Sequence, residues 1–173
     1  FIVVVGADIV KITHGFCHHS IEAKMVGQDT DIGLKMLPEC YCPPAPESSC
    51  PCCSGVNFSD CCQPLLEGRE IADTAEQLMR SRYCAHATGQ IQYIVDTWEQ
   101  EQRLQLDIEA IKTWALNAEW LSLQILTTSN GAEGDDTGKV EFAASYKSEG
   151  RVQLHCETSQ FVCRAGCWYF VNS

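Results

Sequence analysis

Basic residues are scarce in this chain. The 173 residues include 12 lysines and arginines against 23 aspartates and glutamates, which gives a formal net charge of −11. Proteins bind nucleic acids and anionic membranes by neutralising phosphates with lysine and arginine. We therefore expect neither nucleic acid nor membrane as a partner, and the acidic balance suits a basic surface on another protein.

Long apolar runs are also absent. No segment approaches the ~20 apolar residues needed to cross a bilayer. Residues 1–5 are apolar, but they lack a basic lead-in and are followed at once by Gly6 and Asp8, which is not the form of a signal peptide. The sequence thus predicts no membrane-inserted segment.

Sequence motifs of the common nucleotide, calcium and catalytic sites are missing. The chain has no G-x-G-x-x-G, no Walker loop and no Asp-rich calcium loop. No Ser–His–Asp or Cys–His pairing can be placed from spacing alone. We predict no catalytic residue, and the sequence favours a role other than an enzyme.

Cysteine, by contrast, is abundant, with 12 residues. Many cysteines without export features are typical of a reducing compartment, where thiols stay free to bind metal. We therefore expect a cytoplasmic protein.

Five of these cysteines fall within residues 50–62. A Cys-x-Cys pair is separated by eight residues from a Cys-Cys pair, and the fifth cysteine, Cys53, lies between the two pairs. Two pairs of thiolates joined by a short loop can surround one tetrahedral ion at ~2.3 Å. The spacing predicts a zinc site formed by Cys50, Cys52, Cys61 and Cys62. Four protein ligands leave no position for water or substrate, so the site is expected to be structural.

Two alternatives accompany this interpretation. A disulfide cluster is disfavoured because the adjacent Cys61 and Cys62 would need two separate partners. A redox role is the second alternative, in which Cys53 attacks when zinc leaves. Whether Cys53 replaces a ligand or oxidises is left open.

Residues 50–62, read as Cys-Pro-Cys-x-Ser-Gly-x-x-Phe-x-x-Cys-Cys, resemble a SEC-C motif, the zinc hairpin of the SecA translocation ATPase. Further segments follow in the order typical of the YchJ family: Leu78-Met79-Arg80-Ser81-Arg82-Tyr83, Thr97-Trp98, Glu119-Trp120-Leu121, Glu157-x-Ser159-x-Phe161 and Trp168-Tyr169. The resemblance covers about residues 48–172. It implies an α+β fold, the cone-shaped domain of the cystatins and nuclear transport factor 2, and no known activity.

The SecA motif docks other proteins, so the resemblance also implies a protein partner bound through the hairpin. This copy departs from the usual pattern, which carries glycine and several lysines, because it has Cys53, Val56, Asn57, Ser59 and Asp60. The loss of positive charge makes ribosomal RNA, phospholipid and acidic grooves poor partners.

Three parts are predicted: an N-terminal extension at 1–47, the zinc hairpin at 48–68 and the α+β domain at 69–173. A proline-rich linker at 43–49 marks the first boundary. In the extension we expect strands at 2–5 and 9–12 and short helices at 21–25 and 32–37. Its Cys17-His18-His19 and Cys40-x-Cys42 groups match no known metal cage.

Helical spacing predicts three helices in the α+β domain, followed by an antiparallel meander. The first, capped by Asp73 or Thr74, turns Ala75, Leu78, Met79 and Arg82 inward and ends before Gly89; the second spans 91–98; the third, 108–116, is capped by Asp107 with Ile108, Ile111 and Ala115 inward. Strands are expected at 121–125, 140–146, 152–163 and 167–171, with a loop at 130–138. The apolar positions of the third strand change parity, which predicts a bulge near Ser159.

The implied cone fold carries a pocket at its open end. The pocket candidates, from the positions that match the family, are Arg82, Tyr83, Trp98, Trp120, Glu157 and Ser159. A buried Arg82 would need a partner, and we expect a bidentate pair with Glu157, for which Arg80 is the alternative partner.

Two functions follow from these features. The first is a zinc-binding accessory protein whose hairpin docks another protein while the cone domain serves as scaffold or ligand pocket. The alternative is a small-molecule-binding protein or enzyme that uses the cone pocket, with Glu157 as acid or base and His86 or His155 as other possible bases.

Overall fold

The structure, a computed structural model, describes residues 44–171. The elements and the two Cys/His groups predicted for residues 1–42 lie outside this range. The division into parts at 48–68 and 69–173 stays a prediction.

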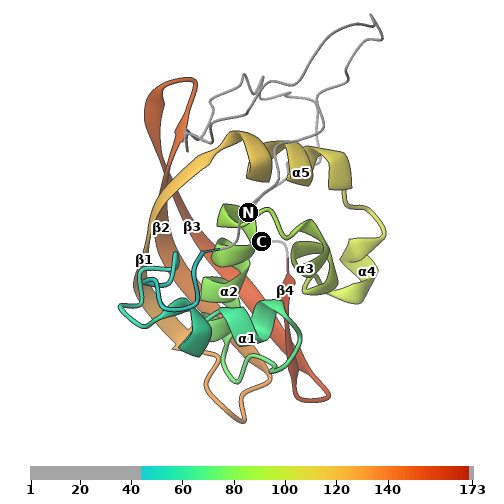
Figure 1. The fold of residues 1–173 in the computed structure, drawn as a ribbon. Helices are drawn as coiled ribbons and strands as arrows, with labels where there is room; N and C mark the ends of the chain where they lie inside the picture. The colour runs from blue at the N-terminus through green and yellow to red at the C-terminus, as the bar shows by residue number, and fades with distance from the viewer. Residues whose placement is uncertain (1–43, 172–173) are drawn as a thin grey trace, which may run out of the picture.

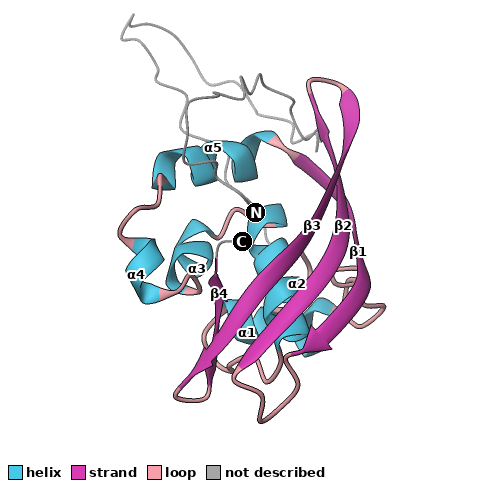
Figure 2. Cartoon of the chain, turned by 180° about the vertical axis from the view of Figure 1, so that it is seen from behind, coloured by secondary structure: helices cyan, strands magenta, loops and turns pink. Residues whose placement is uncertain are grey.

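A four-stranded antiparallel sheet forms one layer of the molecule. Its strands are β1 (Glu119–Asn130), β2 (Thr137–Ser148), β3 (Arg151–Arg164) and β4 (Cys167–Val171), in the spatial order β1-β2-β3-β4. The sheet twists strongly, and the helices lie together on one of its faces (Figures 1 and 2). The predicted α+β architecture with helices on an antiparallel meander is confirmed.

The main helix, α2 (Ala75–Ala87), packs against that face and contacts β1, β2 and β4. It begins at Thr74, whose hydroxyl accepts a hydrogen bond from the Gln77 backbone N–H at 3.1 Å. An N-cap of this kind satisfies a backbone donor that the first helical turn leaves unpaired. Leu78 and Met79 are fully buried, as the helical spacing predicts.

The other helices are short. They are η1 (Phe58–Asp60), α1 (Gln63–Leu66), α3 (Ile91–Asp96), α4 (Gln100–Arg103) and α5 (Ile108–Asn117). The side chain of Asp107 caps α5 as expected, but Ile108 is 46% exposed and only Ile111 and Ala115 point into the core. Of the helices in residues 44–171, none is long and apolar enough to span a bilayer.

The core lies between α2 and the sheet. Val140, Phe142 and Ala144 on β2 are fully buried, as their alternation predicts. The buried cysteines of the hairpin belong to the same cluster as the buried residues of α2 and the sheet. Hairpin and cone therefore share one core rather than having two.

The predicted bulge near Ser159 is wrong. The β2–β3 register runs without interruption from Ser148 opposite Arg151 to Thr137 opposite Val162. The parity changes because Val152 and Leu154 are 68% and 69% exposed on the outer face, whereas Ser159 and Phe161 are buried on the inner one.

The irregularities lie in β1 instead. Its register shifts between Trp120 and Ser122 and between Ile125 and Thr127. The first shift places Leu121 on the surface, 43% exposed, although its alternation with Leu123 predicts burial.

Two leucines test this assignment of faces. Leu123→Ala should lower the free energy of unfolding by about 2–5 kcal/mol, because it removes a buried side chain and leaves a cavity. Leu154→Ala, the same chemical change on the outer face, should alter it by less than about 0.5 kcal/mol. Denaturant unfolding measures both, and equal losses would contradict the outward orientation of the first half of β3.

Candidate metal centre and aromatic cluster

The hairpin is a tight backbone structure built on two short turns. The backbone N–H of Cys50 donates to Val56 at 2.9 Å, and that of Cys53 donates to Cys50 at 3.0 Å. Cys53 and Gly55 have positive φ angles of 58° and 81°. A positive φ suits glycine and strains other residues, so the turn that carries Cys53 is held by its surroundings.

This backbone brings together the four predicted ligands. The Sγ atoms of Cys50, Cys52, Cys61 and Cys62 all lie within 4.8 Å of one another. The Cys52–Cys61 and Cys61–Cys62 sulfur pairs are 3.6 and 3.8 Å apart. Four sulfurs bound tetrahedrally at ~2.3 Å lie about 3.8 Å from one another, so the donor set fits a zinc-sized ion. The cluster could hold a metal ion, and the identity of that ion as zinc is a prediction.

All nine cysteines in residues 44–171 are free thiols. The pKa values of Cys50 and Cys61 shift in opposite directions. The Cys52 thiol raises the pKa of Cys50, but hydrogen bonds with Cys62 and Cys84 outweigh it and lower the pKa to about 7. Burial raises the pKa of Cys61 to about 11, against a 3.2 Å hydrogen bond with the Ser54 hydroxyl. A bound cation would replace these protons, since thiolates are the ligands.

Cys53 is not part of this group. It is exposed, and its thiol donates to the carbonyl oxygen of Pro51 at 3.5 Å. The structure therefore does not place Cys53 as a fifth ligand of the four-sulfur site.

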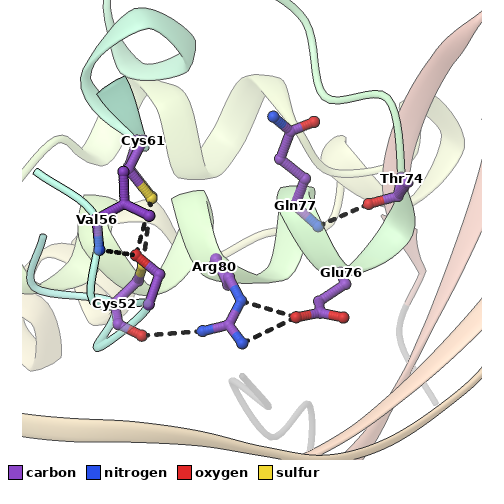
Figure 3. A network of polar contacts seen from close by, with 9 residues as sticks. Cys52, Val56, Cys61, Thr74, Glu76, Gln77 and Arg80 are labelled. Carbon is purple, nitrogen blue, oxygen red and sulfur yellow. Dashed lines mark hydrogen bonds and ion pairs between the residues drawn. The ribbon is translucent and has the colours of Figure 1, made fainter. Parts of the chain in front are cut away.

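Arg80 joins the hairpin to α2 (Figure 3). Its Nη1 donates to the Cys52 carbonyl oxygen at 3.1 Å, while Nε and Nη2 both contact the Glu76 carboxylate at 2.8 Å. Arg80 is thus paired on its own helix, and the expectation that it could partner Glu157 is wrong.

Arg82 points the other way, into the cone, and is fully buried. Its Nη1 donates to the Ile94 carbonyl and to the Thr97 hydroxyl, and its guanidinium lies 4.5 Å from the Phe170 ring centroid. Its Nε and Nη2 have no hydrogen-bond partner within residues 44–171. Burial lowers the pKa of Arg82 to about 9, although Tyr93 and Glu157 oppose the shift.

The predicted bidentate Arg82–Glu157 pair is therefore wrong. The Glu157 carboxylate accepts hydrogen bonds from Ser159 at 2.8 Å and from His155 at 2.9 Å. The three residues alternate along β3, so their side chains share its inner face. Burial raises the pKa of Glu157, but the His155 hydrogen bond leads the opposing influences, and the pKa falls to about 2.

The remaining candidates separate into two places. Trp98 packs edge-on against Phe170, with ring centroids 4.5 Å apart, beside Arg82. Tyr83 and Trp120 belong instead to an aromatic cluster formed by Tyr83, His86, Trp114, Trp120, Tyr146 and His155, in which neighbouring rings lie 5.1–6.3 Å apart. Tyr83 and His86 are buried, whereas the other four rings are partly exposed.

Several of these residues are absent from the predicted site. Trp114 lies three residues after the buried Ile111 on α5, a spacing that places both on neighbouring faces of a helix. That signal was available, but a stripe of this kind is equally consistent with ordinary core. Tyr146 follows the alternation of β2 and Cys84 lies on α2, and nothing else in the sequence marks either residue as part of a site.

Comparison with known proteins now identifies the family. Residues 74–173 match the family model described as the middle NTF2-like domain of YchJ. The chain belongs to the YchJ family.

Two relatives in this family match about seven tenths of the chain. A UPF0225 protein of Geobacter sulfurreducens is 41% identical over 123 residues, covering 71% of this chain and 76% of its own length. One from Actinobacillus succinogenes is 43% identical over 124 residues, covering 72% and 80%.

Two solved structures are similar as well. The solution structure of a SEC-C motif containing protein from Rhodopseudomonas palustris has 39% identity and a TM-score of 0.67, covering 72% of this chain and 96% of that one. The crystal structure of a SEC-C motif containing protein from Psychrobacter arcticus has 34% identity and a TM-score of 0.65, covering 73% and 82%. Both support the assignment of a YchJ-type cone with a SEC-C hairpin.

The role of Arg80 in this YchJ-family chain can be tested by hydrogen exchange. Arg80→Gln removes the charged hydrogen bond to Cys52, which is worth about 1.5 kcal/mol, so the hairpin amides should exchange about tenfold faster. Arg69→Gln is the control, because among residues 44–171 the Arg69 side chain pairs with Glu67 alone, at the surface. Unchanged exchange at residues 50–62 in the Arg80 variant would show that this contact does not hold the hairpin to α2.

Proposed function

We propose that this protein is a zinc-binding accessory protein whose hairpin docks another protein, with the cone domain as its scaffold. The main support for this proposal is the group of four thiols formed by Cys50, Cys52, Cys61 and Cys62, whose Sγ atoms lie within 4.8 Å of one another. A tetrahedral set of four thiolates suits zinc and leaves no vacant position, which is the form of a structural rather than a catalytic site.

The hairpin cysteines and Arg80 of α2 have different roles. The four thiols would hold the ion, and Arg80 holds the Cys52 backbone against α2. When bound, zinc supplies four bonds to a loop too short to have a core of its own, an apparent ~10–16 kcal/mol in zinc-finger peptides. A hairpin fixed in this way keeps its exposed tip in one conformation.

The tip supports docking by its composition. Cys53, Gly55, Val56 and Asn57 are exposed, and Val56 presents 44% of its surface. An apolar side chain on a rigid loop, on a chain with a net charge of −11, suits a partner with a shallow apolar site in a basic surface. We retain the cytoplasm as the predicted compartment, where the thiols would stay reduced.

Metal analysis of protein purified under reducing conditions should find one zinc per chain. Chelation should disorder residues 48–66, seen as loss of amide protection there, while circular dichroism of the cone persists. Cys52→Ser should lose the zinc, and Cys156→Ser, which changes an exposed thiol on β3, should keep it.

Docking has its own readout in the same proteins. A partner captured by crosslinking to wild-type protein should be lost in Cys52→Ser and in the folded, zinc-loaded Val56→Asp, but kept in Cys156→Ser. Metal-free wild-type protein would contradict the zinc site, and capture that survives Val56→Asp would contradict docking through the tip.

A second candidate function is the binding of an organic cation at the aromatic cluster. The observation that favours it is the placement of a half-buried Glu157 on the inner face of β3, joined by a hydrogen bond to His155. His155 belongs to the aromatic cluster, in which Trp114, Trp120 and Tyr146 are partly exposed. Aromatic faces with a nearby carboxylate bind quaternary ammonium groups. A carboxyl with a pKa of about 2 is a poor proton acceptor near neutral pH, so this arrangement suits binding better than acid–base catalysis.

Choline provides a direct probe of this second candidate. Millimolar choline should quench the tryptophan fluorescence and raise the melting temperature of wild-type protein. Glu157→Gln should abolish both effects. Glu133→Gln makes the same chemical change in an exposed loop and should leave both effects intact. No response in the wild type, or an equal response in Glu157→Gln, would contradict cation binding at this cluster.

A further inference from the structure

A fifth thiol lies beside the four-sulfur group, on a different part of the fold. Cys84 belongs to α2, is fully buried, and its Sγ is 3.5 Å from the Sγ of Cys50. This separation matches the 3.6 and 3.8 Å between sulfurs inside the group. It is also close to the ~3.8 Å expected between two ligands of one tetrahedral zinc.

Cys84 is shielded from solvent as completely as three of the hairpin cysteines. Cys50, Cys52 and Cys62 are buried, as is Cys84. All four belong to the same buried cluster, so the contact between Cys84 and Cys50 lies inside the shared core.

Cys61 is the exception among the hairpin ligands. It is the one member of the four-sulfur group that is not fully buried, and its thiol also contacts the Ser54 hydroxyl at 3.2 Å. A solvent-borne oxidant or a competing thiol would reach this ligand first, because access governs thiol reactivity. Cys84, which contacts the group through Cys50, is by contrast fully buried.

We propose that Cys84 is a reserve metal ligand, which replaces Cys61 when that thiol leaves the ion. The inference rests on the proposed zinc site. Cys84 is not a member of the group within 4.8 Å, so the exchange requires the ion to move toward Cys50 and α2. The step is balanced: the Cys84 thiol gives up its proton as its sulfur binds, and the departing Cys61 thiolate takes one up.

The exchange has a structural consequence. With Cys61 as ligand, all four bonds lie within the hairpin, and the ion fixes only its shape. With Cys84 as ligand, the ion bonds hairpin and α2 together, in addition to the Arg80 contact. Loss of the exposed ligand would then leave the metal bound and the hairpin attached to the cone.

The test uses full-length protein loaded with Co²⁺, whose thiolate charge-transfer absorption reports the number of bound sulfurs. Wild type and Cys84→Ala should each bind one ion with the absorption of four sulfurs, and Cys61→Ser should do the same through Cys84. The double variant Cys61→Ser/Cys84→Ala should lose one sulfur contribution and bind at least about tenfold more weakly in chelator competition than Cys61→Ser.

Cys61→Ser/Cys163→Ala is the matched control, since Cys163 lies in β3 and should not alter metal binding. Circular dichroism and the melting temperature of each metal-loaded variant check that the cone is intact. Equal spectra and affinities for Cys61→Ser and the Cys84 double variant would overturn the reserve role and leave the four-cysteine site standing. A wild type that binds no ion would overturn the zinc site itself.

Discussion

The packing of the cysteine hairpin against α2 is the constraint on which the metal centre depends. The hairpin is too short to bury a core alone, and its buried cysteines share one cluster with α2 and the sheet. Its conformation includes the positive φ of Cys53, which needs an external restraint. The contacts that supply it are sulfur to sulfur at Cys50–Cys84 and guanidinium to carbonyl at Arg80–Cys52. A metal ion would complete this set.

The helix α2 divides its faces between the two candidate sites. Arg80 and Cys84, four residues apart, both contact the hairpin. Arg82 and His86, also four residues apart, face the cone, where Arg82 bonds Thr97 and His86 meets Trp114. Helical periodicity accounts for this division, because residues at i and i+4 lie on the same face. One helix therefore positions the metal centre and the aromatic cluster together.

Local signals in the sequence were sufficient for much of this structure. Thr74 and Asp107 mark helix starts because their side chains cap backbone donors, and the alternation of Val140, Phe142 and Ala144 marks a strand with one buried face. The cysteine spacing placed four thiols around one point. Each of these depends on residues close together in the chain.

Contacts between distant segments were not predictable in the same way. The outer-face positions of Val152 and Leu154 look like core positions in sequence, so their parity suggested a bulge that the register does not have. Arg82 has a backbone carbonyl, a hydroxyl and an aromatic ring as partners, none of which charge pairing would select. Cys84 reads as a small helix residue until the fold brings it to Cys50.

X-ray absorption spectroscopy at the zinc edge, on reduced protein as purified, tests the central claim most directly. The account predicts a single shell of four sulfurs at ~2.3 Å with no nitrogen or oxygen neighbour. A shell containing oxygen or nitrogen ligands, or protein with no bound zinc, would contradict a closed four-sulfur centre.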